Sequence, residues 1–439
     1  MYILVQLVNK YRSFILNIVD RFPESFQKKL RQFYRFYVST AQKNLLKNLA
    51  SKGFQFNGAT YILPDSIAKT NAKGINLVGF VSGQFGLGQH LRNVGMAFES
   101  GKIDKIYFSI DQYSALVSAK SQEDKEISQS LKYNTNIFVC NGDSLCSIVL
   151  DNKNIFRNRY NINYGAWELS NYPAEWLPSL NIFDEYWAMS SFLQKSVSSS
   201  AIIPVIHMPY PIDFEVPHHI VRKDFNLPEH LFLFIFTFDI SSLASRKNPQ
   251  AVIKAFLKAF GNKEEVGLVI KVSSNKTLKT HSKEIKEIMS LAKNDKRVFL
   301  INEVLSREYI LGLINSCDVY VSLHRAEGLG IGMAEAMKMG KVVIATNYSG
   351  NTDFTLHDNS CLVDYKLIDV KPLEYIYEKG NVWADPEIDH AVYYMRKLYD
   401  DRSYYKKLSS KGREYIDTHY NAKVIMEKYH KRLKLLGLL

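Results

Sequence analysis

Short apolar runs alternate with amphipathic helical stretches in two successive series along this chain. The apolar runs of the first series lie at 75–83, 105–111, 136–142, 159–167, 185–190 and 201–211. Those of the second series lie at 232–239, 267–273, 297–302, 318–324 and 341–347. Strands that alternate with helices form parallel sheets covered by helices. The pattern therefore predicts two α/β sheets.

The two series are separated by residues 211–230, "PIDFEVPHHIVRKDFNLPEH", where the periodicity fails and Pro, His and charged residues accumulate. A length of 439 residues also favours two large domains. We predict an α/β chain with two Rossmann-like, doubly wound domains at 74–215 and 216–395. A helical extension at 1–73 precedes them, and a helical tail at 396–439 is expected to return to the first domain. Ligands of such sheets bind beyond the carboxyl ends of the strands, so both domains are expected to face one cleft.

The composition is that of a globular protein, with 46% hydrophobic and 23% charged residues. No apolar run approaches the ~20 residues that a membrane-spanning helix needs. The N-terminus lacks a basic region and a small-residue cleavage site, so we expect no secretory signal. The four cysteines are scattered and form no CxxC pair, which favours a reduced, cytoplasmic protein without a zinc site.

Positive charge is concentrated at the N-terminus. Residues 1–74 hold twelve Lys or Arg against three Asp or Glu, and so carry most of the net charge of +12. Within them, residues 24–52 show apolar residues at helical spacing with a basic opposite face. Such a helix either packs on the body of the protein or contacts an anionic membrane surface. A nucleic-acid-binding arm is a third reading, although the aromatic–basic signatures of RNA binding are absent.

The most informative segment is 323–351, "LHRAEGLGIGMAEAMKMGKVVIATNYSGN". A strand leads into the glycine-rich turn "EGLGIG", and a short helix follows that ends near Gly340. Helix N-terminal amides made accessible by glycines bind anions such as a diphosphate. Glu327 lies in the turn and Glu335 about 10 Å further along the helix, a separation that suits two polyhydroxylated groups on either side of a diphosphate. The alternative is a strand–helix connection with two solvated glutamates.

"EGLGIGMAE" resembles the E-x7-E motif of retaining glycosyltransferases of family four, which have the GT-B fold. "FDISSLASRKNPQAVIKAFLKAF", "SLHRAEG" and "GKVVIATNYSGNTDF" resemble segments of the donor domain of that family. "YGAWELSNYPAEWLPSLNIFDEYWAMSSF" is similar to a bacterial subgroup that builds cell-surface polysaccharides. The resemblance covers about residues 75–400 and leaves out residues 1–70.

The resemblance implies that Glu327 contacts the hydroxyls of the donor sugar and that Glu335 holds the ribose. The amides of Gly328, Leu329 and Gly330 would lie along the sugar and diphosphate. Lys247 matches the diphosphate-binding lysine of the family, and Arg246 beside it is expected to help. A second, earlier cation of the family is replaced here by residues 239–241 (Asp-Ile-Ser).

Other donor contacts are expected from two loops. "GQFGLGQ" (83–89) resembles the glycine loop of the first domain, so Gly86 and Gly88 are donor-binding candidates, although close strand–helix packing explains such a loop equally well. A dinucleotide-binding reading lacks a well-placed acidic residue, since Asp111 fits only loosely. Backbone contacts to the base are expected around Val304 and Leu305.

Candidate residues for the acceptor are Asp143, Trp167 and Glu168. Asp143 orients an acceptor hydroxyl or is a turn residue. Trp167 and Glu168, at the end of a predicted strand, suit stacking on a sugar and binding its hydroxyls, unless Trp167 belongs to the core. Lys271 is expected to be structural.

The resemblance implies a metal-independent, retaining hexosyltransferase without a cofactor. Its expected substrates are a nucleotide sugar and a saccharide or lipid-linked saccharide, and it would act in cell-surface polysaccharide synthesis at the cytoplasmic side of the membrane. No DxD metal motif follows a strand. The two glutamates do not suit the ~5 Å spacing of a retaining glycosidase. The alternatives are another GT-B enzyme, such as a nucleotide-sugar epimerase or a sugar phosphorylase, or a non-catalytic protein that binds sugar or nucleic acid.

Overall fold

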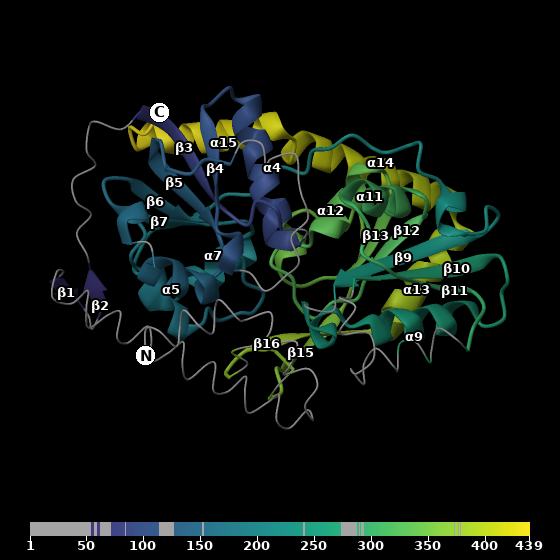
Figure 1. The fold of residues 1–439 in the computed structure, drawn as a ribbon. Coiled ribbons are helices and arrows are strands. Elements are labelled where there is room, and N and C mark those ends of the chain that lie inside the picture. Colours follow the sequence, from purple (N-terminus) through teal and green to yellow (C-terminus); the bar gives the residue numbers. More distant parts are fainter. Residues whose placement is uncertain are drawn as a thin grey trace. The chain divides into compact units, whose positions relative to one another are not determined.

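The computed structural model contains two α/β units (Figure 1). It describes residues 72–113, 127–273 and 294–439, except 84, 152, 240, 241, 373, 376 and 378, together with 54–56, 59–61, 288 and 290. The expected helix at 24–52 lies outside the described residues, as does most of the one expected at 281–293. The first unit includes the described residues up to Trp167, Asn171–Pro211 and Ala422–Leu439. The second contains Glu168–Ser170 and Ile212–Asn421.

The first unit is built on a six-stranded parallel sheet in the order β4-β3-β5-β6-β7-β8. Its strands are β3 (Ala72–Gly79), β4 (Lys105–Ser109), β5 (Tyr133–Val139), β6 (Tyr160–Asn163), β7 (Glu185–Ala188) and β8 (Val205–His207). Its helices are α4 (Gly86–Ser100), α5 (Gly142–Asp151), α6 (Leu177–Leu180), α7 (Ser191–Ser198) and α15 (Ala422–Leu435). The central strands are buried on both faces, as parallel strands between helices require.

The second unit has the same architecture, with a parallel sheet in the order β11-β10-β9-β12-β13-β14. Its strands are β9 (Phe232–Asp239), β10 (Val266–Ser273), β11 (Val298–Asn302), β12 (Val319–Ser322), β13 (Val342–Thr346) and β14 (Cys361–Val363). Its helices are α8 (Ala244–Lys247), α9 (Pro249–Phe260), α11 (Arg307–Asn315), α12 (Ile331–Lys338), α13 (Ile388–Asp400) and α14 (Arg402–His419). An antiparallel hairpin, β15 (Tyr365–Asp369) and β16 (Val382–Pro386), follows β14.

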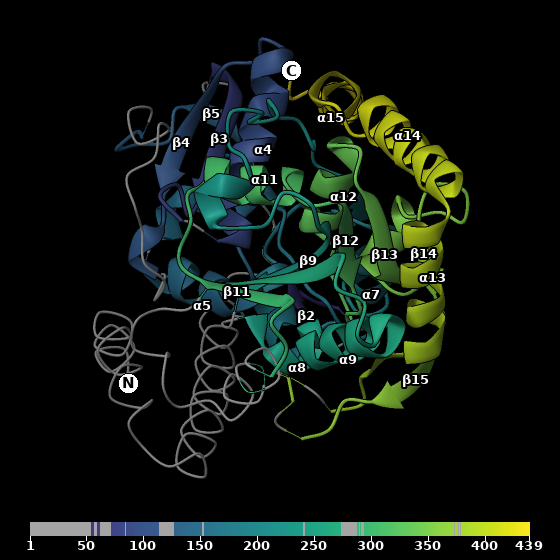
Figure 2. The ribbon, with the colours of Figure 1, turned by 90° about the vertical axis from the view of Figure 1, so that its right-hand side faces the viewer.

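Alternate residues of β9 pack on opposite sides of the second sheet, as the two-residue repeat of a strand dictates. Four phenylalanines share one core with α9 and α13, namely Phe232, Phe234, Phe236 and Phe238. Thr237 belongs to the opposite set and bonds to Tyr320 on the neighbouring β12, with 2.8 Å between the two hydroxyl oxygens. Figure 2 shows the packed pairs α9 with α13 and α12 with α14.

The C-terminal tail is divided between the units. Helix α14 belongs to the second unit, whereas α15 packs against α4 of the first. A buried ion pair fixes α15: Arg432 Nε lies 3.0 Å from a carboxylate oxygen of Glu185, whose other oxygen accepts a hydrogen bond from Trp187 Nε1 at 2.7 Å. A separate antiparallel pair, β1 (Phe54–Phe56) and β2 (Ala59–Tyr61), precedes β3.

Three details differ from the sequence-based expectation. The strand expected at 201–211 is only three residues long, because Pro204 and Pro209 flank it and cannot donate ladder hydrogen bonds. The strand expected at 159–167 ends at Asn163. Residues 168–170, expected in the first domain, belong to the second unit. Among the described helices, none combines the length and apolar character that a membrane span demands.

Candidate functional site

The glycine-rich turn connects β12 to α12 at the carboxyl end of the second sheet. Gly330 caps α12 with a φ of +93°, a left-handed conformation that glycine adopts without strain. Gly332, in the first turn, leaves room for a tyrosine beneath it, because a Cβ at this position would lie 2.5 Å from the Tyr320 hydroxyl. The first turn of α12 therefore rests on the hydroxyl pair of Tyr320 and Thr237.

The loop after β13 braces this turn from the other side. Glu327 N donates to Ser349 Oγ at 2.8 Å, and Gly350 N donates to Glu327 O at 2.9 Å. A Cβ on Gly350 would lie 2.1 Å from the carbonyl oxygen of Gly328, so only glycine permits this approach. The backbone around Glu327 is held at both its amide and its carbonyl group.

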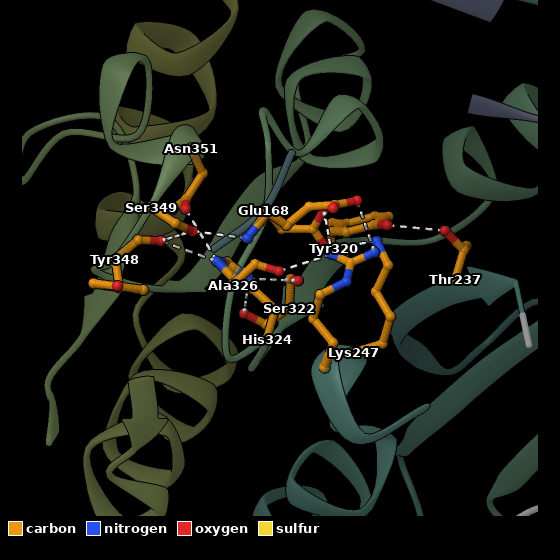
Figure 3. A network of polar contacts seen from close by, with 12 residues as sticks. Glu168, Thr237, Lys247, Tyr320, Ser322, His324, Ala326, Tyr348, Ser349 and Asn351 are labelled. Carbon is orange, nitrogen blue, oxygen red and sulfur yellow. Dashed lines mark hydrogen bonds and ion pairs between the residues drawn. The ribbon is translucent and has the colours of Figure 1, made fainter. Parts of the chain in front are cut away.

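The carboxylate of Glu327 is buried between two cations, one of which, Lys247, is labelled in Figure 3. Lys247 Nζ lies 2.5 Å from Oε1, and Arg246 Nη1 lies 3.2 Å from Oε2. Burial by itself would raise the pKa of Glu327, but Lys247 and Arg246 outweigh it and lower the pKa to about 2. Burial lowers the pKa of Lys247, and Glu327 opposes that shift. The site thus holds a buried, ionised carboxylate.

Both cations come from the single-turn helix α8, which is fastened to the segment after β12. Asn248 Nδ2 donates to Leu323 O at 3.0 Å, and Arg325 N donates to Arg246 O at 2.8 Å. Because these two hydrogen bonds connect α8 and its C-cap residue to the segment that leads into the Glu327 turn, the side chains of Lys247 and Glu327 meet although 80 positions separate them.

Arg246 occupies the centre of a larger network. Its guanidinium donates to Ala326 O at 2.7 Å and lies 3.5 Å from Glu168 Oε1. Tyr375, from the segment between β15 and β16, donates to Glu168 Oε2 at 2.5 Å. Burial and the neighbouring carboxylate of Glu168 raise the pKa of Tyr375, so the phenol keeps its proton. Arg246 therefore bridges two carboxylates and a carbonyl, which makes it a scaffold for Glu327 and Glu168.

His324 joins β12 to the bracing loop. Its Nε2 lies 3.2 Å from Tyr348 O and 3.0 Å from Asn351 Oδ1, and its Nδ1 lies 2.9 Å from Ser322 Oγ. Nδ1 also lies 3.2 Å from Ser322 O. We assign the proton to Nε2, because both groups that face it are acceptors, whereas the serine hydroxyl can donate to Nδ1. Burial lowers the pKa of His324, although Glu327 opposes that shift. A neutral imidazole thus supports the loop that holds Glu327.

Glu335 lies on α12 and is 3% exposed. Its Oε1 lies 2.6 Å from Nη2 of Arg307, at the start of α11, yet no described group donates a well-aligned hydrogen bond to that oxygen. The candidate base-binding residues Val304 and Leu305 come just before Ser306, the N-cap residue of α11, and Val304 is 66% exposed. The carboxylate of Glu335 and this exposed loop are thus linked through Arg307.

Asp239, at the end of β9, occupies one of the positions at which family four glycosyltransferases carry their second cation. The other two positions, 240 and 241, lie outside the described residues. Lys271 on the adjacent strand is buried, which lowers its pKa, while the carboxylate of Asp239 opposes the shift. Lys271 and Asp239 are thus electrostatically coupled on neighbouring strands.

Of the candidates in the first unit, Gly88 has a packing reason to be glycine, since a Cβ there would lie 2.0 Å from Gly83 O. Gly86 begins α4 and has open space at the same position. Trp167 is 1% exposed, packs edge-to-face on Trp176 and donates from Nε1 to Asn171 O at 2.8 Å. Trp167 therefore belongs to the core, and its buried ring has no exposed face on which a sugar could stack. The side chain of Asp143 lies outside what the structure describes.

The structure thus brings together Glu327, Lys247, Arg246 and Glu168, whereas Glu335 pairs separately with Arg307. Sequence reasoning missed Arg307, Tyr375, and the supporting roles of Tyr320 and His324. The sequence does hold one indication for Arg307. A cation in the first turn of a helix is unfavourable beside the helix dipole, so its presence there indicates another contact. Tyr375 has no such signal, because it stands in an irregular segment.

Chemically, the second unit offers an ionised carboxylate that can accept hydrogen bonds from hydroxyls, a lysine beside it, and helix N-terminal amides for an anion. Two units of open parallel sheets with helices on both faces define the GT-B fold. Solved structures confirm this fold. HepE from Anabaena, determined with UDP and glucose, matches with a TM-score of 0.61 at 12% identity over 83% of this chain and 100% of that one.

Two further solved structures share the fold. Sucrose-phosphate synthase from Thermosynechococcus elongatus matches with a TM-score of 0.60 at 14% identity, over 83% of this chain and 99% of that one. A glycosyltransferase from Rickettsia africae matches with a TM-score of 0.58 at 12% identity, over 82% and 98%. At such identities the likeness establishes the fold alone.

The family comparison points to one class of enzyme. Residues 221–415, nearly the whole second unit, match the family model described as glycosyl transferases group 1. A comparison with curated protein sequences finds no match. The family match, on a GT-B fold, supports a glycosyltransferase.

Proposed function

We propose that this chain is a retaining glycosyltransferase that moves a hexose from a nucleotide-diphosphate sugar to a hydroxyl of a saccharide or lipid-linked saccharide. The observation that carries the proposal is the Glu327 carboxylate, buried and ionised at the N-terminal end of α12 with Lys247 in contact. A carboxylate in this position is an acceptor for sugar hydroxyls, and the lysine and helix amides complement a diphosphate.

The second supporting observation is the state of Glu335. Its Oε1 is buried without a well-aligned donor among the described residues, and buried polar atoms normally have a partner. A ribose hydroxyl of the bound donor would supply the missing hydrogen bond. Glu327 at the sugar and Glu335 at the ribose would then fix the two ends of the donor, with the diphosphate between them.

In the proposed reaction, the acceptor oxygen forms a bond to the anomeric carbon on the side from which the diphosphate leaves. The bond between that carbon and the phosphate oxygen breaks, and the proton of the acceptor hydroxyl passes to the departing diphosphate. Lys247 and the α12 amides stabilise the negative charge that develops on the leaving group. They supply this stabilisation without a metal ion, so activity should survive EDTA.

The contributions of the remaining residues follow from their contacts. Arg246 holds Glu327 and Glu168 in place, while Glu168, partly exposed and bonded to Tyr375, remains the candidate for contact with acceptor hydroxyls. Removing one stabilising group of this kind costs on the order of 10²–10³ in kcat. We expect a loss of that size for Lys247→Met, with a smaller change in KM.

The proposed acceptor places the enzyme at the cytoplasmic face of a membrane, in the synthesis of a cell-surface polysaccharide. The basic segment at 1–70 is proposed to contact the anionic surface there. Deletion of this segment should lower the fraction of protein that sediments with vesicles containing phosphatidylglycerol. The difference between the full chain and the deletion variant should disappear at high salt, because salt screens the attraction. Equal sedimentation of both forms would contradict the membrane role.

A thermal-shift screen with GDP-, UDP-, ADP- and dTDP-sugars tests the donor site directly. We expect one class to raise the melting temperature, and Glu327→Ala and Lys247→Ala to reduce that rise. Lys411→Ala is the matched control, because Lys411 pairs with Asp358 in an exposed contact elsewhere in the unit. No shift with any donor, or equal shifts in all variants, would contradict the proposal.

A further inference from the structure

The ion pair between Arg307 and Glu335 joins two helices of the second unit. Glu335 lies in α12 and is almost fully buried, whereas the side chain of Arg307, the first residue of α11, is 31% exposed. The carboxylate therefore lies inside the protein and its cation lies at the surface. A buried ion pair of this kind costs desolvation energy and contributes little net stability. We therefore look for its role in ligand binding.

Arg307 is the cation that the structure assigns to Glu335, although another is closer in sequence. Lys338 lies three residues further along α12, where an intrahelical pair is common. Its ammonium instead lies 3.2 Å from Asp213 and 3.1 Å from Asp417. The charge of Lys338 is thus shared by two other carboxylates, which leaves Glu335 to Arg307.

The guanidinium of Arg307 is held from two directions. Its central carbon lies 5.7 Å from the centre of the Phe214 ring, within the range of a cation–π contact, and Nη2 contacts Glu335. A cation at the first position of a helix opposes the helix dipole and is unfavourable there. The position of Arg307 is therefore explained by its contacts with Glu335 and Phe214 and not by the stability of α11.

The contact leaves the carboxylate incompletely bonded. Arg307 compensates the charge of Glu335, while Oε1 still lacks a well-aligned donor among the described residues. This arrangement fixes the direction of the carboxylate and leaves it able to accept a hydrogen bond from a further hydroxyl. Leu305 and Val304, two and three residues before Arg307, belong to the loop proposed to contact the base.

We propose that Arg307 is a positioning residue that gives the donor site its preference for ribose over 2′-deoxyribose, by holding the Glu335 carboxylate directed at the ribose hydroxyls. The inference rests on the proposed function and extends it to the choice of donor. Without the guanidinium, the buried carboxylate loses the partner that compensates its charge and fixes its direction, and its hydrogen bonds to the ribose weaken.

The test compares the Kd of UDP, GDP and ADP with that of their 2′-deoxy counterparts, by calorimetry on the full chain. A hydrogen bond to a charged group corresponds to a preference of about tenfold to a hundredfold for the ribose form in the wild type. Arg307→Met is expected to reduce this ratio to within about threefold, chiefly by weakening the ribose form. Arg307→Lys should retain part of the ratio, because it keeps a cation.

Lys338→Met is the matched control, since Lys338 also lies near Phe214, at 5.8 Å from the ring centre, but does not pair with Glu335. It should leave the ratio unchanged. The double variant Arg307→Met/Glu335→Gln removes both charges together, so it leaves no buried carboxylate without a cation and remains testable if the single variant does not fold. It should show the same low ratio as Arg307→Met.

The outcomes separate the two proposals. If the wild type prefers ribose and Arg307→Met keeps the full ratio, or weakens both forms of the nucleotide equally, Arg307 has only a structural role and the inference is overturned. If the wild type binds a nucleoside diphosphate without a ribose preference, the inference also fails while the donor site stands. If the wild type binds none of them, the proposed function itself fails.

Discussion

Replacing Glu327 with glutamine is expected to destabilise the second unit at pH 7 and to flatten its response to acid. Lys247 and Arg246 both contact the Glu327 carboxylate within a buried site, so the variant leaves two cations without their shared anion. Removing one partner of a buried pair costs about 3–5 kcal/mol. We expect a loss of that size in the free energy of unfolding at pH 7.

The acid response follows from the pKa of the same carboxyl group. Burial would raise it, but the two cations lower it from 4.5 to about 2. At about 1.4 kcal/mol for each pKa unit, the difference corresponds to about 3 kcal/mol of stability. Because the folded pKa is the lower one, this stabilisation is fully present above pH 4.5 and is lost as the pH falls from 4.5 towards 2.

The assay is urea unfolding of the wild type and Glu327→Gln between pH 7 and pH 2.5. The difference in free energy between the two proteins should shrink by about 3 kcal/mol towards the acid end. Glu264→Gln is the control, because Glu264 pairs with Lys296 on an exposed surface, and it should behave as the wild type. A difference below about 1 kcal/mol at pH 7, or one that does not depend on pH, would refute the reasoning.

Three further predictions concern other positions. Arg432→Met leaves the buried Glu185 without its cation, so α15 should become susceptible to limited proteolysis and the protein should lose about 3–5 kcal/mol; unchanged digestion would contradict this. Burial lowers the pKa of His90 to about 3, so the wild type should lose up to about 5 kcal/mol as the pH falls from 6.5 to 3, and His90→Leu should remove that loss from the pH profile. Gly332→Ala should cost about 1–3 kcal/mol by contact with the Tyr320 hydroxyl, and Tyr320→Phe should restore part of the stability; no rescue would show that the hydroxyl is not the obstacle.

Much of the fold could be predicted from the sequence, because apolar residues recur with a helical period in the helices and form short continuous runs in the buried strands. The β9 segment reads as a buried strand, and the stretch from Pro249 to Phe260 reads as an amphipathic helix, whatever surrounds them. Strand ends were harder: Pro204 and Pro209 shorten β8, and prediction from apolar character alone overlooks the missing donors.

Within the site, the residues with a fixed local spacing were the ones that could be predicted. Glu327 and Glu335 stand eight positions apart on one turn and helix, and Lys247 was identified by its family resemblance. The partners of these residues come from distant parts of the chain: Tyr375 reaches Glu168 across 207 positions, and Arg307 belongs to a different helix from Glu335. Such contacts depend on tertiary packing, which leaves no local pattern to detect.

Glycosyl transfer with retention can be tested without knowing the acceptor. A transferase incubated with its nucleotide sugar alone slowly transfers the sugar to water, and proton NMR identifies the anomer that forms first. We predict release of the sugar with the same anomeric configuration as in the donor, at a rate that Lys247→Met lowers by about 10²–10³. Release of the opposite anomer first would contradict retention, and conversion of the donor into an epimer, or no release with any donor that binds, would contradict glycosyl transfer.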